Sequence, residues 1–184
     1  MAYVFGNAVT DATLRAMPEF QGKKTTLQDK ARVALTLKHS DGKDVAVREQ
    51  VQNLTAGGER TTICLIYNAT GDTLTLVNYQ DWIGHVGSSP YPPLIGNGQW
   101  GVFLHVGDES AAYSSAGAVF YRGKNKDGQD RDWMQAWSNT RKANKVRVGN
   151  FMFYLTYYPS MGGATHGWLN DIRGVQKSVK TEIN

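Results

Sequence analysis

Cysteine is nearly absent from this chain, and this excludes a fold held together by internal disulfides. The single cysteine, Cys64, lies in the apolar run ICLIY between Ile63 and Leu65. Apolar neighbours of this kind predict a buried, protonated thiol in a strand and argue against a reactive nucleophile. One cysteine cannot form an intramolecular bridge, so a hydrophobic core has to stabilise the domain.

Long apolar runs and long runs of like charge are also missing. No stretch approaches the roughly 20 apolar residues that span a bilayer, and the first residues lack the pattern of a secretory signal. We therefore expect a soluble protein made in the cytosol. The net charge of +4 is a mild bias. Its cations alternate with acidic residues and no nucleic-acid-binding motif occurs, which argues against nucleic acid as a partner.

Catalytic and metal-binding patterns are lacking as well. The four histidines (His39, His85, His105 and His166) show no metal-ligand spacing, and no phosphate-binding glycine loop or nucleophile motif is present. Asp130 and Asp132, two residues apart, would share one face of a strand. A solvated strand end explains this pair better than acid–base chemistry does. We expect no enzyme activity, no cofactor and no metal.

The elements that are present predict a mainly β fold. Residues 26–37 have helical spacing with the capping pair Thr26 and Asp29. A second helix is expected to start with Asp44 as its cap and to end before the glycines at 57–58. Beyond Gly58, two apolar runs flank the turn at 68–72 and are expected to form a hairpin.

Further strands are expected at 100–106, at 116–123 and after the turn at 124–130, whereas residues 1–22 are weakly patterned. The prediction is one domain over 1–184, with a helical part (1–58) and a β core (59–184). Its architecture would be a β-sandwich with two short flanking α-helices.

Aromatic residues are concentrated near the C-terminus. Phe153, Tyr154, Tyr157 and Tyr158 fall within six positions. Converging tyrosine rings can hold a quaternary ammonium group by cation–π attraction, although one tyrosine face of a buried strand would give the same spacing. Other aromatics exceed the needs of a core and suit a membrane interface or a sugar: Trp82, Tyr91, Trp100, Tyr113, Trp133 and Trp137.

Four segments carry a resemblance to a known superfamily: IYNATGDTL, SPYPPLIGNGQWGVFLH, AGAVFYRGKN and DWMQAWS. With them, residues 62–168 resemble the actinoporin-like cytolysins and lectins. The resemblance is greatest to the branch that holds the fungal lipid-binding protein nakanori and plant 23-kDa jasmonate-induced proteins, and is close enough to include nakanori itself. It implies the actinoporin-like β-sandwich.

Short motifs of actinoporins proper recur in the same order. Their Asn-x-x-Gly-x-Thr turn corresponds to 68–73, and their Met-Tyr-x-x-x-Tyr-Tyr segment to 152–158. In that family these tyrosines and a preceding serine form a phosphocholine pocket that recognises sphingomyelin. The resemblance therefore implies a head-group site here at Ser138, Tyr157 and Tyr158, with Phe153 in place of a tyrosine. Phe153 would keep the cation–π face but lose a hydrogen bond to phosphate.

Two departures from actinoporins shape the expected behaviour. The aromatic membrane loop is replaced by the short basic segment 140–144, so aromatic anchoring has to come from Trp82, Tyr91 or Tyr113. Residues 1–22 contain Pro18 and no long apolar stripe, which makes a poor inserting helix. The expectation is a protein that binds sphingomyelin-rich, cholesterol-containing membranes without efficient pore formation, with its oligomeric state left open.

Three other interpretations remain. A lectin would stack a sugar on Trp82 beside Asp81, or on Trp133 beside Asp132. A pore-forming cytolysin would release vesicle contents. A plant-type stress protein would have no small ligand.

Overall fold

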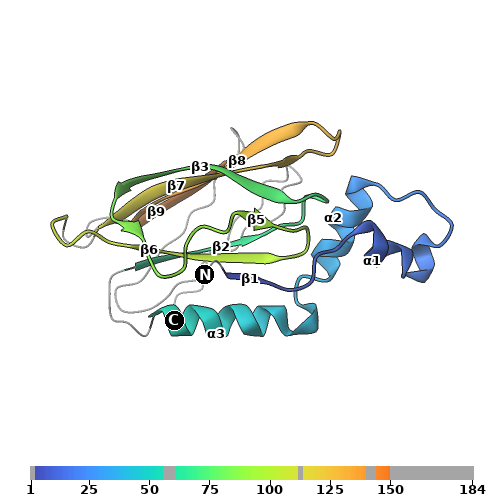
Figure 1. Cartoon of the computed structure of the whole chain (residues 1–184), viewed down its shortest axis with the longest axis horizontal. Coiled ribbons are helices and arrows are strands. Elements are labelled where there is room, and N and C mark those ends of the chain that lie inside the picture. Colours follow the sequence, from blue (N-terminus) through green and yellow to red (C-terminus); the bar gives the residue numbers. More distant parts are fainter. Residues whose placement is uncertain (1–2, 56–60, 112–113, 140–143, 150–184) are drawn as a thin grey trace.

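The computed structural model describes residues 3–55, 61–111, 114–139 and 144–149 (Figure 1). Its helices are α1 (Asp11–Arg15), α2 (Leu27–Thr36) and α3 (Lys43–Thr55), with 3-10 turns η1 (Pro18–Phe20) and η2 (Ser40–Gly42). Its strands are β1 (Tyr3–Phe5), β2 (Thr61–Tyr67), β3 (Leu74–Ile83), β4 (His85–Val86), β5 (Leu94–Ile95), β6 (Trp100–Val106), β7 (Ser115–Lys124), β8 (Asp130–Asn139) and β9 (Asn144–Gly149).

These strands form two antiparallel sheets. The first has the order β1-β6-β2, with β4 also pairing with β6, and the second has the order β5-β3-β7-β8-β9. Between them lies one apolar core, to which β2 contributes Cys64 and Ile66, β6 contributes Phe103, and β7 and β8 contribute Val119 and Trp137. The predicted mainly β sandwich is confirmed.

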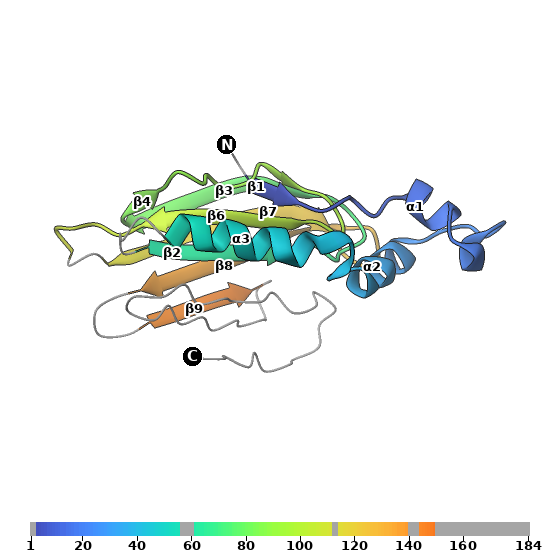
Figure 2. The ribbon, with the colours of Figure 1, turned by 90° about the horizontal axis from the view of Figure 1, so that it is seen from below.

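A second core lies on the other face of the first sheet, where the helices pack. Val33 and Ala34 of α2, and Val47 and Val51 of α3, join strand residues such as Leu65 in this cluster. In Figure 2, α3 runs across β2 and β6. The molecule therefore has three layers: helices, the first sheet and the second sheet.

Both predicted helices are present. The side chain of Thr26 accepts from the backbone N–H of Asp29, and the Asp29 carboxylate accepts from the backbone N–H of Thr26, which makes the expected capping box at the start of α2. α3 begins at Lys43, one residue before the expected cap. The structure also contains a short third helix, α1, which was not predicted from the sequence. A second capping box, between Thr10 and Thr13, stabilises its start. The weakly patterned segment 1–22 also contains β1, which pairs with β6 in the first sheet.

The predicted hairpin between β2 and β3 is wrong, because these strands belong to different sheets. β2 pairs with β6, whereas β3 pairs with β5 and β7. β2 is buried on both faces: Ile63 and Leu65 face the helix layer, and Cys64 and Ile66 face the second sheet. A continuous apolar run fits a strand covered on both sides, so the turn at 68–72 carries the chain from the middle layer to the outer one.

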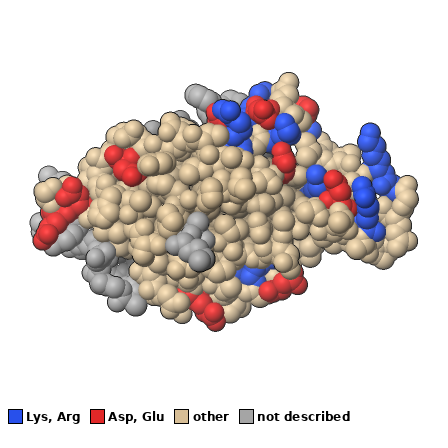
Figure 3. All heavy atoms as spheres, in the orientation of Figure 1, with Lys and Arg blue, Asp and Glu red and all other residues tan. Residues whose placement is uncertain are grey.

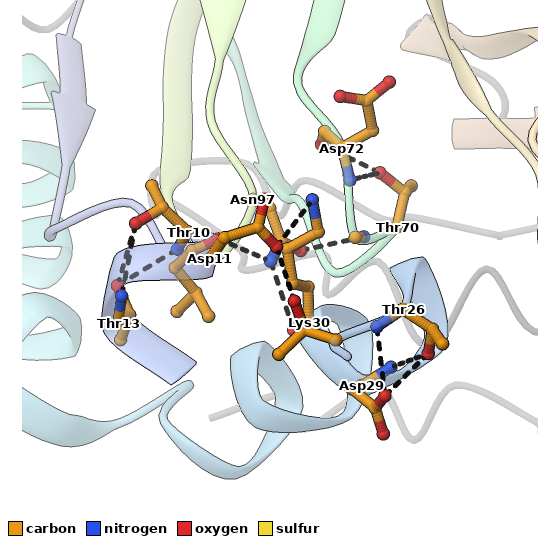
Figure 4. A network of polar contacts seen from close by, with 12 residues as sticks. Thr10, Asp11, Thr13, Thr26, Asp29, Lys30, Thr70, Asp72 and Asn97 are labelled. Carbon is orange, nitrogen blue, oxygen red and sulfur yellow. Dashed lines mark hydrogen bonds and ion pairs between the residues drawn. The ribbon is translucent and has the colours of Figure 1, made fainter. Parts of the chain in front are cut away.

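Asn97 ties the helical part to this crossover (Figure 4). Its Nδ2 donates to the carbonyls of Val9 and Lys30, and its Oδ1 accepts from the backbone N–H of Gly71. Gly71 has φ 88°, and a Cβ there would lie 2.1 Å from the carbonyl oxygen of Leu27. A glycine is required at this contact.

The turn expected at 124–130 is present over residues 125–129, and it joins β7 and β8 into an antiparallel hairpin. The Arg122 guanidinium donates twice to the Asp132 carboxylate, at 2.8 and 2.9 Å, and Lys124 donates to Asp130 at 2.8 Å. These solvated ion pairs hold the pKa values of both aspartates below the ordinary value. Asp130 and Asp132 therefore lie at a solvated strand end, as the sequence indicated.

Candidate functional site

The outer part of β3 is an irregular and open strand. Its register against β7 shifts between Leu76 and Asn78, and again between Asp81 and Ile83. Between Thr75 and Ile83, the residues left without a partner in β7 are Val77 and Trp82. β5 pairs with β3 only at Leu74 and Thr75, so the rest of this edge has no strand partner among the residues described. Bulges of this kind re-aim side chains and are typical of sheet edges near functional sites.

Two aromatic side chains stand out on this strand. Trp82 is 60% exposed and Tyr79 is 53% exposed. The Tyr79 ring lies 5.2 Å from the ring of Tyr91, centroid to centroid. Tyr91 is itself buried and packs edge-on against Phe103, at 4.9 Å. An aromatic stack therefore runs from solvent into the core between the sheets.

A chain of polar groups lies behind this stack. The Tyr91 hydroxyl donates to Oδ1 of Asp81 at 2.6 Å, and Nε2 of His105 lies 3.4 Å from the same oxygen. Nδ1 of His105 lies 2.7 Å from Oγ of Ser115. Burial raises the pKa of Tyr91, which keeps its phenol protonated as a donor.

The partners of Ser115 determine the tautomer of His105. Oγ of Ser115 accepts from Oγ1 of Thr62 at 2.9 Å and from Nε1 of Trp137 at 3.1 Å. With both lone pairs used, the serine hydroxyl donates its proton to Nδ1 of His105. The neutral imidazole then carries its proton on Nε2, facing Asp81. Burial lowers the pKa of His105, and the Asp81 carboxylate opposes this only in part.

The Ser115, His105 and Asp81 arrangement resembles a hydrolytic triad in composition but is not placed to act as one. Ser115 and His105 are fully buried, so the serine oxygen cannot reach a substrate. That oxygen already accepts two hydrogen bonds, and the histidine meets it as an acceptor through Nδ1. The network is suited to holding Tyr91 and Trp137 in position. Within the described ranges, no three His, Cys, Asp or Glu side chains gather as metal ligands.

Cys64 lies where its apolar neighbours indicated. It is buried between the sheets, and burial raises the pKa of its thiol. This environment favours the protonated, unreactive form.

Ser138 lies on the face of β8 that points away from the core. Its neighbour Trp137 is buried between the sheets, and adjacent strand residues project to opposite faces. In register, Ser138 lies between Ala116 of β7 and Lys145 of β9. Ser138 was predicted to share its function with four aromatic residues that lie outside the described residues: Tyr113, Phe153, Tyr157 and Tyr158. Tyr154 also lies outside them.

The structure separates the remaining aromatic candidates. Trp82 is exposed as expected, but Tyr91 is buried and serves as a support for Tyr79. Tyr79 was missed, because the two bulges break the alternation by which its position could be inferred. The network around His105 was also missed: its members come from five strands and, with Tyr91, from the segment between β4 and β5, and no local motif marks them.

Neither sugar-stacking pair is brought together on one surface. Asp81 is committed to Tyr91, and the adjacent Trp82 projects outward at a bulge. Asp132 pairs with Arg122, whereas Trp133 packs against the core between the sheets. The geometry therefore does not favour the lectin interpretation.

Comparison with known proteins gives a consistent result. The chain is 42% identical over 138 residues to a 23 kDa jasmonate-induced protein of Hordeum vulgare, and 32% identical over 113 residues to a jasmonate-induced protein homolog of Atriplex canescens. These matches cover 73% and 56% of this chain, and 65% and 60% of the relatives, so the chain spans less than two thirds of either one.

A crystal structure of the lipid binding protein Nakanori superposes with a TM-score of 0.69 at 30% identity, over 79% of this chain and 72% of that one. At this identity the chain is a relative of Nakanori and a different protein. No helix in the described ranges has the length and apolarity to cross a bilayer. The Nakanori-like protein family matches residues 5–152, most of the chain, and this protein belongs to that family.

Proposed function

We propose that this protein binds lipid membranes by recognising choline head groups, above all sphingomyelin in cholesterol-containing membranes. The observation that carries the proposal is the pair of exposed aromatics, Tyr79 and Trp82, on an open strand edge of a Nakanori-like chain. Tryptophan and tyrosine are enriched where a bilayer meets water, because each has an apolar ring and a polar tip. The structural likeness to a lipid binding protein supports the same conclusion.

The head group would be held by the residues that the resemblance implies. A trimethylammonium group would lie against Phe153, Tyr157 and Tyr158 by cation–π attraction. Ser138 would donate to the phosphate.

Binding without efficient perforation fits the N-terminal structure. β1 is paired into the first sheet, and α1 is only five residues long. A segment that is built into the fold in this way would have to leave its sheet before it could insert. We assign the protein no catalytic role.

Vesicle sedimentation tests the proposal. Wild-type protein should pellet with sphingomyelin–cholesterol vesicles and pellet much less with choline-free vesicles that contain phosphatidylethanolamine. Equal binding to both would contradict choline recognition. The double variant Tyr157→Ala with Tyr158→Ala should lose binding while its circular dichroism spectrum stays unchanged. Dye retained inside the vesicles would separate a binder from a pore-former.

A further inference from the structure

Exposed apolar side chains gather on one edge of the second sheet. Among the described residues, five large hydrophobic side chains are exposed, and four of them lie on β3 or β5. We call these four the β3–β5 strip: Val77, Tyr79, Trp82 and Leu94. The fifth, Val45, lies in α3, on the helix layer.

The strand irregularities coincide with this strip. The two residues that β3 inserts into its ladder with β7, Val77 and Trp82, are both exposed and apolar. Leu94 pairs with Thr75, next to the first bulge. Bulges on an edge strand also hinder the addition of another strand. We therefore do not expect a β-strand from a second copy of this chain to pair with the strip.

The strip lies in a long part of the chain that has no cations. No Lys or Arg occurs between Arg60 and Arg122, although the chain has 20 of them and a net charge of +4. On β3 and β5 the single charged residue is Asp81, which accepts from Tyr91. In Figure 3, the broad middle of the face in view is uncharged, and the Lys and Arg side chains visible on this face lie mostly toward the α1–α2 end and the upper right margin.

A surface with these properties matches a particular kind of membrane. Anionic lipids and nucleic acids attract clusters of Lys and Arg, which the strip does not offer. The cation that β7 places opposite β3 is Arg122, in register with Thr75, and it is paired with Asp132. A zwitterionic interface carries no net charge and accommodates Trp and Tyr beside polar neighbours such as the exposed Asn78 and Gln80.

The strip has a rigid support. Tyr79 rests on Tyr91, and Tyr91 is fixed by its hydrogen bond to Asp81 and by its contact with Phe103. A pre-ordered surface loses little conformational entropy when it binds.

From these observations we propose that the β3–β5 strip docks onto the interface of a zwitterionic lipid bilayer, as a contact surface on strands other than β8, which carries the head-group residue Ser138. This inference rests on the proposed membrane binding and names the surface that makes the contact. Contact through Val77, Trp82 and Leu94 would place β3 along the membrane plane.

The test compares matched variants on vesicles of defined composition. The triple variant Val77→Ser, Trp82→Ser and Leu94→Ser should bind sphingomyelin–cholesterol vesicles about tenfold more weakly or worse, since it removes three exposed apolar groups that docking would bury in the interface. Val45→Ser removes an equally exposed apolar side chain from the helix layer, and should bind within about twofold of wild type. The loss of vesicle affinity in the triple variant should be the same at low and at high salt, because the contribution of the strip to binding does not depend on charge.

Fluorescence locates the contact directly. Brominated phosphatidylcholine should quench Trp82 in wild-type protein, and Trp82→Phe should keep binding but lose most of that quenching. Unchanged binding by the triple variant, or unchanged quenching in Trp82→Phe, would overturn the strip as the docking surface. A triple variant that becomes monomeric from a wild-type dimer and still binds vesicles would identify a second copy as the occupant, and would also overturn the proposal. If wild-type protein binds no choline vesicle at all, the proposed function itself fails.

Discussion

Nδ1 of His105 lies 2.7 Å from Oγ of Ser115, and this buried contact links the two sheets of the sandwich. His105 belongs to β6 in the first sheet and Ser115 to β7 in the second. Because Ser115 also accepts from Thr62 and Trp137, its proton can go only to the histidine. The neutral imidazole is thus part of the packing between the sheets.

Stability should therefore fall as the pH is lowered from about 7 to 5.5. The pKa of His105 is lowered in the folded state, so the unfolded chain, with an ordinary value near 6.5, binds the proton more readily in this range. The contribution is fully present above 6.5 and is lost as the pH falls, by at most about 1.4 kcal/mol per pH unit. Urea unfolding at several pH values measures this slope.

His105→Asn provides the matched variant for that slope. An Asn oxygen can still accept from Ser115, but the side chain does not titrate. The variant should be less stable overall because it leaves a cavity, yet its stability should change little between pH 7 and 5.5. An unchanged slope would show that another group titrates. The aspartates with lowered pKa values lose their contribution only at lower pH, near and below their ordinary value of 3.8.

Asn97→Ala should destabilise the protein by about 2–4 kcal/mol, because it leaves two carbonyls and the N–H of Gly71 without their buried partner. Asn97→Asp tests the donor side separately, since Asp can still accept from Gly71 but cannot donate to Val9 and Lys30. Thermal unfolding should rank the two variants below wild type. If Asn97→Ala lowers the free energy of unfolding by less than about 0.5 kcal/mol, as a typical surface substitution does, the hydrogen bonds of Asn97 contribute little to stability.

Gly117→Ala should destabilise the sandwich by about 1–3 kcal/mol through overpacking. An added Cβ would lie 2.6 Å from Cζ2 of Trp137 and 2.9 Å from the carbonyl oxygen of Gln80. The Trp137 ring would have to move, which should shift its near-ultraviolet circular dichroism. Gly128→Ala controls for glycine replacement at an open site, where nothing lies within 4 Å, although its φ of 75° brings some backbone strain.

Arg122→Ala should lower the free energy of unfolding only slightly, in spite of its bidentate contact with Asp132. Both side chains are about half exposed, and surface ion pairs contribute little after screening and side-chain entropy. The small loss should shrink further in 0.5 M salt. A loss as large as that of a buried core variant such as Gly117→Ala would mean that the pair does more than close the hairpin.

The sequence predicted the elements whose signals are local. The capping pair Thr26 and Asp29 marked the start of α2, and the turn at 125–129 marked the β7–β8 hairpin, because hydrogen bonds within a few residues determine both. The buried state of Cys64 followed from its apolar neighbours. The sandwich and the Nakanori-like family were likewise recognisable from segments spread along the chain.

Contacts between distant residues decided the rest. The sequence by itself determined the mainly β class, the caps and the mild, unevenly distributed charge. Only the tertiary structure decided that β2 and β3 belong to different sheets, since partner choice depends on which faces are covered. It also decided that Tyr91 is buried while Tyr79 and Trp82 are exposed, because two bulges in β3 reset the alternation that a regular strand would follow.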